Sequence, residues 1–162
     1  MDDELREIAR LEALGELSAA HARAIALAQA HPLDVRAQVA AAYACDRNDR
    51  EHDAIRFYDA AWKLGVPLAE QPGFLLGYGS TLRNVGRTDE SISILTDAVR
   101  RFPDQAEFSA FLALSLHSAG RSTSALSTLL KSALQAARPD GFGPYRRALA
   151  EYQQLLADEA AE

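Results

Sequence analysis

The chain has 162 residues, which is about the length of one domain and enough to bury a sizeable core. Hydrophobic residues make up 48% of it, and Ala and Leu greatly outnumber Val and Ile, so the composition argues against global disorder and favours helices over strands. The net charge of −6 comes from acidic ends on a near-neutral middle. This argues against nucleic acid and an anionic membrane surface as partners, because both need clustered Lys and Arg.

The cysteine content and the first residues indicate the cellular compartment in which the protein is expected. Cys45 is the only cysteine, so neither an internal disulfide nor a cysteine metal cluster can form. The opening residues MDDELREIAR carry acids where a secretory signal needs bases. No stretch approaches the roughly 18 continuous apolar residues of a membrane span. We therefore expect a cytoplasmic protein.

The predicted elements are all helices. Apolar residues recur at helical spacing, as in Leu75, Tyr78 and Leu82, and no stretch shows the apolar–polar alternation of a strand. Acidic residues after Thr88 and the Pro103-Asp104 pair are typical of helix starts. In chain order the predicted helices cover residues 2–14, 18–30, 34–46, 51–64, 71–85, 88–101, 105–119, 122–137 and 143–158.

Two independent markers repeat along the chain. Pro32, Pro67, Pro103 and Pro139 lie 35, 36 and 36 residues apart, each after a predicted helix. Gly86-Arg87-Thr88 and Gly120-Arg121-Ser122 lie 34 residues apart, each before an Ala- and Leu-rich helix. A constant period of this length predicts an array of helical hairpins.

The motif within each period resembles the tetratricopeptide repeat (TPR), which has two helices in about 34 residues. The third unit reads Leu75-x2-Tyr78-Gly79-x2-Leu82, then Gly86, Ser91, Ala98 and Pro103. The fourth reads Ser109-x2-Leu112-Ala113-x2-Leu116, then Gly120, Ala125 and Pro139. The second contributes Val39-Ala40-x2-Tyr43, Ala54, Ala61 and Pro67. The segment from Leu75 to Arg87 also looks like a largely uncharacterised bacterial subgroup of these repeats.

The resemblance implies an all-α fold: a right-handed superhelical stack of about four TPR-type hairpins plus a C-terminal capping helix. We expect one TPR-like domain over 1–162, with repeats near 1–34, 35–71, 72–105 and 106–140 and the capping helix at 143–158. Small residues on the first helices, namely Ala40, Gly79 and Ala113, would let the second helices approach closely. The charged run Asp46–Asp53 is expected to be an insertion that replaces the tight glycine turn of the second unit.

Motifs for chemistry are weak in this sequence. Gly77-x-Gly79 lacks the third glycine of a dinucleotide loop and does not follow a strand. Asp46–Asp53 has Glu51 where a calcium loop needs glycine. The four histidines show no zinc-binding spacing, and an inert small residue is the better interpretation of Cys45. We therefore expect no enzyme, no catalytic or metal-binding residue, and no cofactor.

In repeats of this family the first helices line a concave surface that holds ligands. This implies a partner-binding groove made of Gln38, Gly77, Ser80, Arg83, Asn84 and His117, with Asp34, Ala37 and Ala41 beside Gln38 in the second unit. Gly77 either admits a neighbouring helix or leaves a notch for a ligand backbone. Arg83 and Asn84 suit a carboxylate, but Ala37, Ala41, Gly77, Glu107 and Phe111 stand where the chaperone-binding clamp needs its polar residues, which disfavours that ligand class.

Three functional hypotheses follow. The first is a protein–protein interaction module, or adaptor, that binds a peptide or helix of a partner protein in the concave groove. The alternative is a self-associating structural unit that completes its core as a homodimer. The third is a small-molecule sensor or enzyme that uses Cys45, His117 or the Gly77 notch. The sequence itself does not name the partner.

Overall fold

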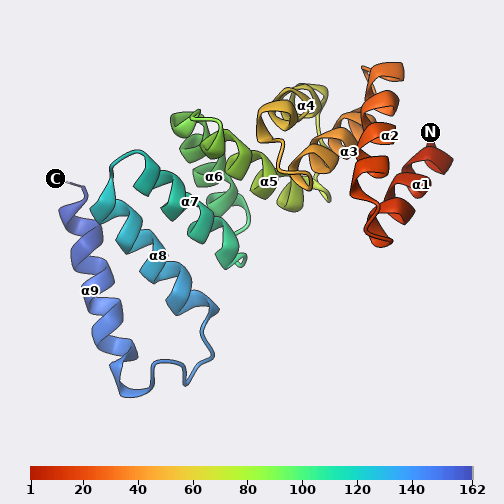
Figure 1. Ribbon diagram of the computed structural model, residues 1–162. Helices are drawn as coiled ribbons and strands as arrows, with labels where there is room; N and C mark the ends of the chain where they lie inside the picture. The colour runs from red at the N-terminus through yellow and green to blue at the C-terminus, as the bar shows by residue number, and fades with distance from the viewer. Residues whose placement is uncertain (162) are drawn as a thin grey trace. The chain divides into compact units, whose positions relative to one another are not determined.

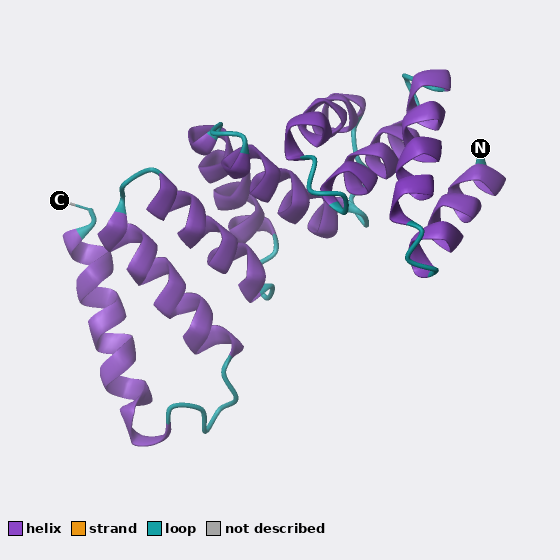
Figure 2. Ribbon diagram, viewed as in Figure 1, coloured by secondary structure: helices purple, strands orange, loops and turns teal. Residues whose placement is uncertain are grey.

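The computed structural model describes residues 1–161, and every regular element in this part of the chain is a helix (Figures 1 and 2). The predicted helices are all present, which confirms the all-α fold of helical hairpins. A short 3-10 turn, η1, precedes the last helix, so that helix begins later than expected. In chain order the elements are α1 (Asp2–Ala13), α2 (Leu17–Ala30), α3 (Val35–Asp46), α4 (Glu51–Leu64), α5 (Gln71–Asn84), α6 (Thr88–Arg101), α7 (Ala106–Ser118), α8 (Ser122–Ala136), η1 (Gly143–Tyr145) and α9 (Arg146–Glu159).

The contacts divide the chain into two compact units, Met1–Thr81 and Leu82–Glu162. In the first unit α1 packs on α2, α2 on α3 and α3 on α4. In the second unit α6 packs on α7, α7 on α8 and α8 on α9. Each helix therefore packs mainly on its neighbours in the sequence, as expected for repeated hairpins.

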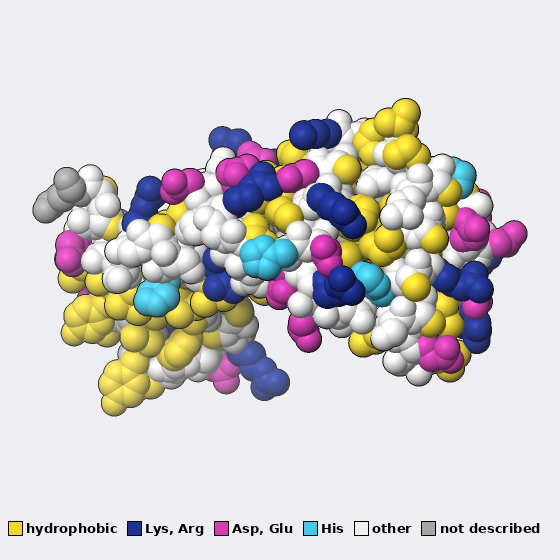
Figure 3. All heavy atoms as spheres, turned by 45° about the horizontal axis from the view of Figure 1, so that its top comes forward, with side chains coloured by type: hydrophobic (Ala, Val, Ile, Leu, Met, Phe, Trp, Pro, Cys, Tyr) yellow, Lys and Arg dark blue, Asp and Glu magenta, His cyan; other side chains and the backbone are white. Residues whose placement is uncertain are grey.

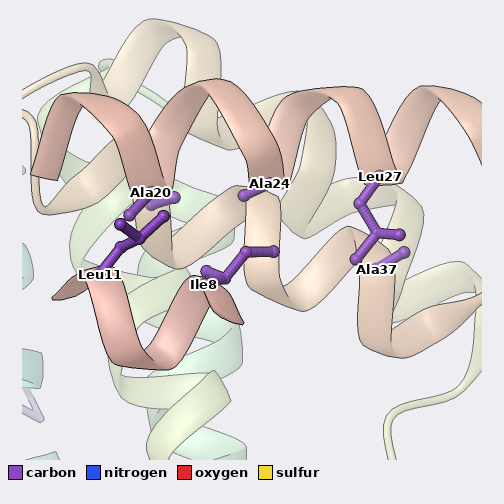
Figure 4. Close-up of a cluster of buried hydrophobic side chains, with 7 residues drawn as sticks. Ile8, Leu11, Ala20, Ala24, Leu27 and Ala37 are labelled. Atoms are coloured by element: carbon purple, nitrogen blue, oxygen red, sulfur yellow. The ribbon is translucent and has the colours of Figure 1, made fainter. Parts of the chain in front are cut away.

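The core of the first hairpin is built from small and branched apolar residues (Figure 4). Ile8 and Leu11 of α1 point at Ala20 and Ala24 of α2, and Leu27 meets Ala37 of α3. The alanines let the helix axes approach closely, and the larger side chains fill the space between them. Burial of this cluster holds the first hairpin together.

The turns between the two helices of each hairpin share one backbone geometry. Gly15, Asp49, Gly86 and Gly120 have positive φ angles of 76°, 54°, 82° and 75°. Each donates its N–H to the carbonyl three residues earlier, and the next residue donates to the carbonyl five residues earlier. Asp is one of the few residues that tolerates this left-handed conformation, so Asp49 replaces the glycine of the other turns.

This shared turn corrects two expectations for the second repeat. The turn at Asp49 is as tight as the others, so Asp46–Asp53 is not an insertion, and the extra length lies between α4 and α5 instead. Counting back from the turn residues, Ala42 corresponds to Gly79 and Ala113. Ala42 is fully buried, whereas Ala40 is only partly buried. The packing position that the motif assigned to Ala40 therefore belongs to Ala42, two residues later.

A buried polar network connects three helices of the first unit. The Tyr58 hydroxyl of α4 donates to the Asp46 carboxylate of α3 at 2.5 Å, and the Thr81 hydroxyl of α5 donates to it at 3.0 Å. Desolvation raises the pKa of the Asp46 carboxyl, while these two donors oppose that shift. The Tyr58 ring also packs edge-on against Phe74 and stacks on Tyr78. Aromatic packing and the shared carboxylate thus fix α5 against α3 and α4.

Candidate functional site

The first unit contains an open groove of about 300 Å³ between α1 and α3. Its apolar part is lined by Leu5 and Ile8 of α1 and by Val39 and Ala40 of α3. Leu5 and Val39 hold matching positions, ten residues before the turn residues Gly15 and Asp49. The groove therefore lies between equivalent faces of two first helices, which is where the family resemblance places ligands.

Charged side chains border this groove. Arg47 of α3 pairs with Glu12 of α1 at 2.9 Å, and Arg36 pairs with Asp2 at 2.8 Å. All four side chains are at least partly exposed, so each pair contributes little to stability. Such pairs nonetheless hold the long arginine side chains beside the apolar lining, where they are available to a bound segment.

Tyr43 combines the apolar and polar properties of the groove. Its ring lines the groove and lies beside the Arg47 guanidinium, which is 5.7 Å from the ring centroid. Partial burial is the main reason that the pKa of its hydroxyl is raised, and the nearby Glu70 carboxylate adds to the shift. Within residues 1–161 no hydrogen bond is made by this hydroxyl. Tyr43 can therefore offer a ring face and a hydrogen-bonding group to one ligand.

The structure places Gln38 inside the first unit. Its side-chain amide donates to the carbonyl of Ala28 at 3.2 Å and to that of Pro32 at 3.3 Å, and the residue is buried. These bonds secure the connection between α2 and α3. Gln38 is buried rather than in the groove because the register of the second repeat is shifted by two residues. Arg36, Val39 and Tyr43 occupy the groove-facing positions instead.

Gly77 lies against the aromatic ring of Tyr58. A methyl group at this position would overlap the Tyr58 hydroxyl and lie 3.2 Å from the ring carbon that carries it. The space next to Gly77 is thus filled by a residue of the neighbouring helix α4. Of the two interpretations of this interior glycine, close helix packing is the one that this contact supports.

Ser80, Arg83 and Asn84 follow Gly77 on α5, and the turn register relates them to the groove residues. Ser80 holds the position of Tyr43, Arg83 that of Asp46, and Asn84 that of Arg47. The Nε of Arg83 is buried and makes no hydrogen bond within the described part of the chain. An unsatisfied buried donor is costly, so this Nε destabilises the position that Arg83 adopts.

His117 lies in the second unit, at the end of α7. It lines an open pocket of about 220 Å³ between α7 and α8, together with Leu114, Leu126 and Leu129. The imidazole is exposed and this pocket is otherwise mostly apolar. The arrangement suits hydrophobic contact with a single polar group at its edge.

Cys45 and the acidic and histidine side chains bear on the chemistry that the described residues could support. Cys45 is fully buried, and burial raises the pKa of its thiol to about 11, so thiolate is scarce at neutral pH. Among the described residues there is no group of three or more His, Cys, Asp or Glu side chains that could hold a metal ion. Within residues 1–161 no helix has the length and apolar character needed to span a bilayer.

Sequence analysis missed the whole α1 side of the groove, and in the second repeat it also missed Arg36, Val39, Tyr43 and Arg47. Val39-Ala40-x2-Tyr43 fits the repeat motif in a register that is wrong by two residues. In that register Gln38, rather than Val39 or Tyr43, faces the groove. The signal that could have found the true register is Asp49. Its place 34 residues after Gly15 marks the turn, and Asp is a residue that accepts a left-handed conformation.

Comparison with known protein families is consistent with the repeated hairpins. The sequence pattern of the tetratrico peptide repeat family matches residues 35–156, which is most of the chain. Comparison with curated proteins gives no match. The chain therefore belongs to the tetratricopeptide repeat family, whose members are generally protein–protein interaction modules.

Proposed function

We propose that this protein is a non-enzymatic adaptor that binds a segment of a partner protein in the groove between α1 and α3. The observation that carries the proposal is an open apolar lining bordered by paired charges, at matching positions of two first helices. Ligand sites commonly combine such a lining with a few polar groups that orient the ligand. The single buried Cys45 fits a reducing cytoplasm.

The chemistry of the groove describes the segment that would fit it. A volume of about 300 Å³ is at the lower end for small-molecule sites and suits one or two apolar side chains of a peptide or helix. These side chains would rest on Leu5, Ile8 and Val39. The Tyr43 hydroxyl and the Arg47 guanidinium would then meet polar groups of the segment beside its apolar anchor.

Four residues predicted from the sequence remain part of the proposal as further partner contacts: Ser80, Arg83, Asn84 and His117. Arg83 suits a carboxylate of the partner, because its guanidinium offers several N–H donors in one plane. Gln38 and Gly77 are left out of the proposed contacts. Their positions are explained by bonds to the α2–α3 connection and by packing on Tyr58.

Site-specific photo-crosslinking tests the proposed groove. A photoreactive phenylalanine at Glu70, an exposed residue that lines the groove but belongs to neither α1 nor α3, is expected to form a discrete adduct with a partner protein in native extract. The same probe at Ala22, an exposed alanine of α2 outside the groove, serves as the matched control. Adducts of equal yield at both positions, or at Ala22 alone, would show that the partner does not bind in this groove.

A further inference from the structure

One position of the repeat is buried in the first three hairpins but exposed in the last one. Counting from the turn residues, Leu129 of α8 corresponds to Ala24, Tyr58 and Leu95, and all three of those residues are fully buried. Leu129 is 47% exposed. In the second unit α7 packs across α6 in front of Leu95, and the Ser91 and Ser115 hydroxyls hydrogen-bond there at 2.8 Å. Within residues 1–161 no helix covers Leu129 in the same way.

The helix α9 packs on a side of α8 other than the one that carries Leu129. The connection before α9 runs from 137 to 145, whereas 102–105 is enough to join α6 to α7. Contact between α8 and α9 is made through Ser127, whose hydroxyl donates to the carbonyl of Gln153 at 3.2 Å, and through Arg146, which donates to the carbonyl of Leu134 at 2.6 Å. Leu126 and Leu129 are thus left open beside the pocket that His117 lines.

One flank of α9 extends this open surface. Tyr152 and Leu155 of α9, with Tyr145 at the N-cap just before it, recur at helical spacing about 100° from the side that faces α8, and all three are exposed. Because α8 and α9 are antiparallel neighbours, this flank lies on the same side of the pair as Leu126 and Leu129. Figure 3 shows hydrophobic side chains gathered over α8 and α9 at the lower left. We call this surface the C-terminal apolar face; its residues are Leu114, Leu126, Leu129, Tyr145, Tyr152 and Leu155.

The size of this face is sufficient for a specific interface. Its six side chains are 44–71% exposed. At the roughly 150–250 Å² typical of large buried side chains, they would bury about 650 Å² on one copy and about 1,300 Å² on two copies, within the range of stable protein interfaces. Isolated exposed leucines are normal, but a contiguous patch of this area usually marks a contact surface.

The other end of the array does not present a matching surface. On α1, the positions that correspond to the inward-facing Phe108, Phe111 and Ser115 of α7 are Asp3, Arg6 and Arg10. Arg6 pairs with Asp3, Arg10 pairs with Glu7, and all of these groups are at least partly exposed. A charged α1 therefore does not suit the C-terminal apolar face of another copy, which argues against head-to-tail assembly.

The charges of α9 point to its partner. Arg146 and Arg147 begin the helix, and Asp158 and Glu159 end it, which is the reverse of what the helix dipole favours. In α6 the acidic residues lie in the first turn and the basic ones in the last. An antiparallel second α9 would lay the basic first turn of each copy beside the acidic last turn of the other, with Arg147, which pairs with Glu151 in its own helix, and Asp158 at the edge of the contact. Opposed charges of this kind set partner and direction when helices associate.

We propose that the C-terminal apolar face is the contact surface of a two-fold symmetric homodimer in which α9 of one copy lies antiparallel to α9 of the second. A two-fold contact uses the same patch on both copies, so a self-complementary patch is what it requires. The C-terminal apolar face belongs to the second unit and shares no residue with the groove between α1 and α3, so a dimer would hold two copies of that groove. The proposal does not depend on a partner being found for that groove.

Sedimentation velocity on the full chain over a concentration series tests the proposal. The wild type is expected to dimerise at micromolar concentration, and Leu155→Lys is expected to weaken the dimer at least about tenfold. Leu68→Lys changes a leucine of the first unit with similar exposure, 68% against 63% for Leu155, and should leave the dimer unchanged. Circular dichroism of each variant checks that its helices are intact.

Charge reversal tests the antiparallel arrangement separately. Arg147→Glu and Asp158→Arg should each weaken the dimer, and the double variant should restore it, because the oppositely charged ends of the two helices lie side by side. The proposal would be overturned by a wild type that stays monomeric to about 100 µM, by a dimer that tolerates Leu155→Lys, or by a double reversal that fails to restore association. Uptake of a different protein's helix on this face by a monomeric chain would also overturn it.

Discussion

Replacing Gly77 by alanine tests the packing of α5 on α4. Alanine is favoured over glycine within a helix by about 1 kcal/mol, so helix propensity alone predicts a more stable protein. The added methyl group would overlap the Tyr58 hydroxyl and lie 3.2 Å from its ring carbon. Relief requires moving a fully buried ring, at a cost of about 1–3 kcal/mol for overpacking. It also weakens a charged hydrogen bond to Asp46 worth about 1.5–3 kcal/mol. We expect Gly77→Ala to lower the free energy of unfolding by about 2–4 kcal/mol.

Urea denaturation followed by circular dichroism measures this change, and Gly73→Ala is the matched control on the same helix. A methyl group at Gly73 meets only the Tyr43 hydroxyl, at an unstrained 3.9 Å, so Gly73→Ala should be neutral or stabilise by up to about 1 kcal/mol. The Tyr58→Phe background removes the overlapping hydroxyl, so Gly77→Ala should cost less there. A Gly77→Ala protein as stable as the wild type would refute the reasoning.

Three further predictions concern the same unit. Cys45 is buried and the pKa of its thiol is raised to about 11, so a thiol reagent should label it at least about 100-fold more slowly in the native protein than in urea; comparable rates would contradict the burial. Asp49→Gly should raise the free energy of unfolding by about 0.5–1 kcal/mol because the residue has a positive φ, and Asp49→Val should lower it; thermal melts that rank the two the other way would be incompatible with the turn. Desolvation raises the pKa of Asp46, so the folded chain holds that proton more tightly than the unfolded chain. The stability of the wild type relative to Asp46→Asn should therefore be greatest below the ordinary Asp pKa of about 4 and fall as the pH rises through the raised value; denaturation curves with a pH-independent difference would count against it.

The fold could be predicted largely from the sequence because its signals are local and repeated. Helical spacing of apolar residues depends only on which face of each helix is buried, and Gly86 and Gly120 mark two equivalent turns. Even so, the register of the second repeat was missed by two residues. Asp49 replaces the expected glycine there, and Val39-Ala40 imitates the repeat motif.

The candidate groove was harder to predict because it depends on that register and on contacts between helices. A difference of two residues in register corresponds to a rotation of about 200° around the helix. Gln38 therefore faces the interior, and Val39 and Tyr43 face the groove. For Gly77 the sequence left two alternatives open. Only the position of Tyr58, a residue of another helix, favours one of them. The exposed side of α9 was likewise not evident, since its apolar residues alone resemble those of a packed helix.

Direct measurement of binding tests the central claim, that the groove between α1 and α3 holds a partner segment. Once the crosslinked partner segment is identified, its Kd is measured by calorimetry for the wild type, for Ala9→Arg, which fills the groove, and for Ala22→Arg, which places the same side chain outside it. We predict at least about tenfold weaker binding for Ala9→Arg and unchanged binding for Ala22→Arg. Equal affinities for the wild type and Ala9→Arg would contradict the claim.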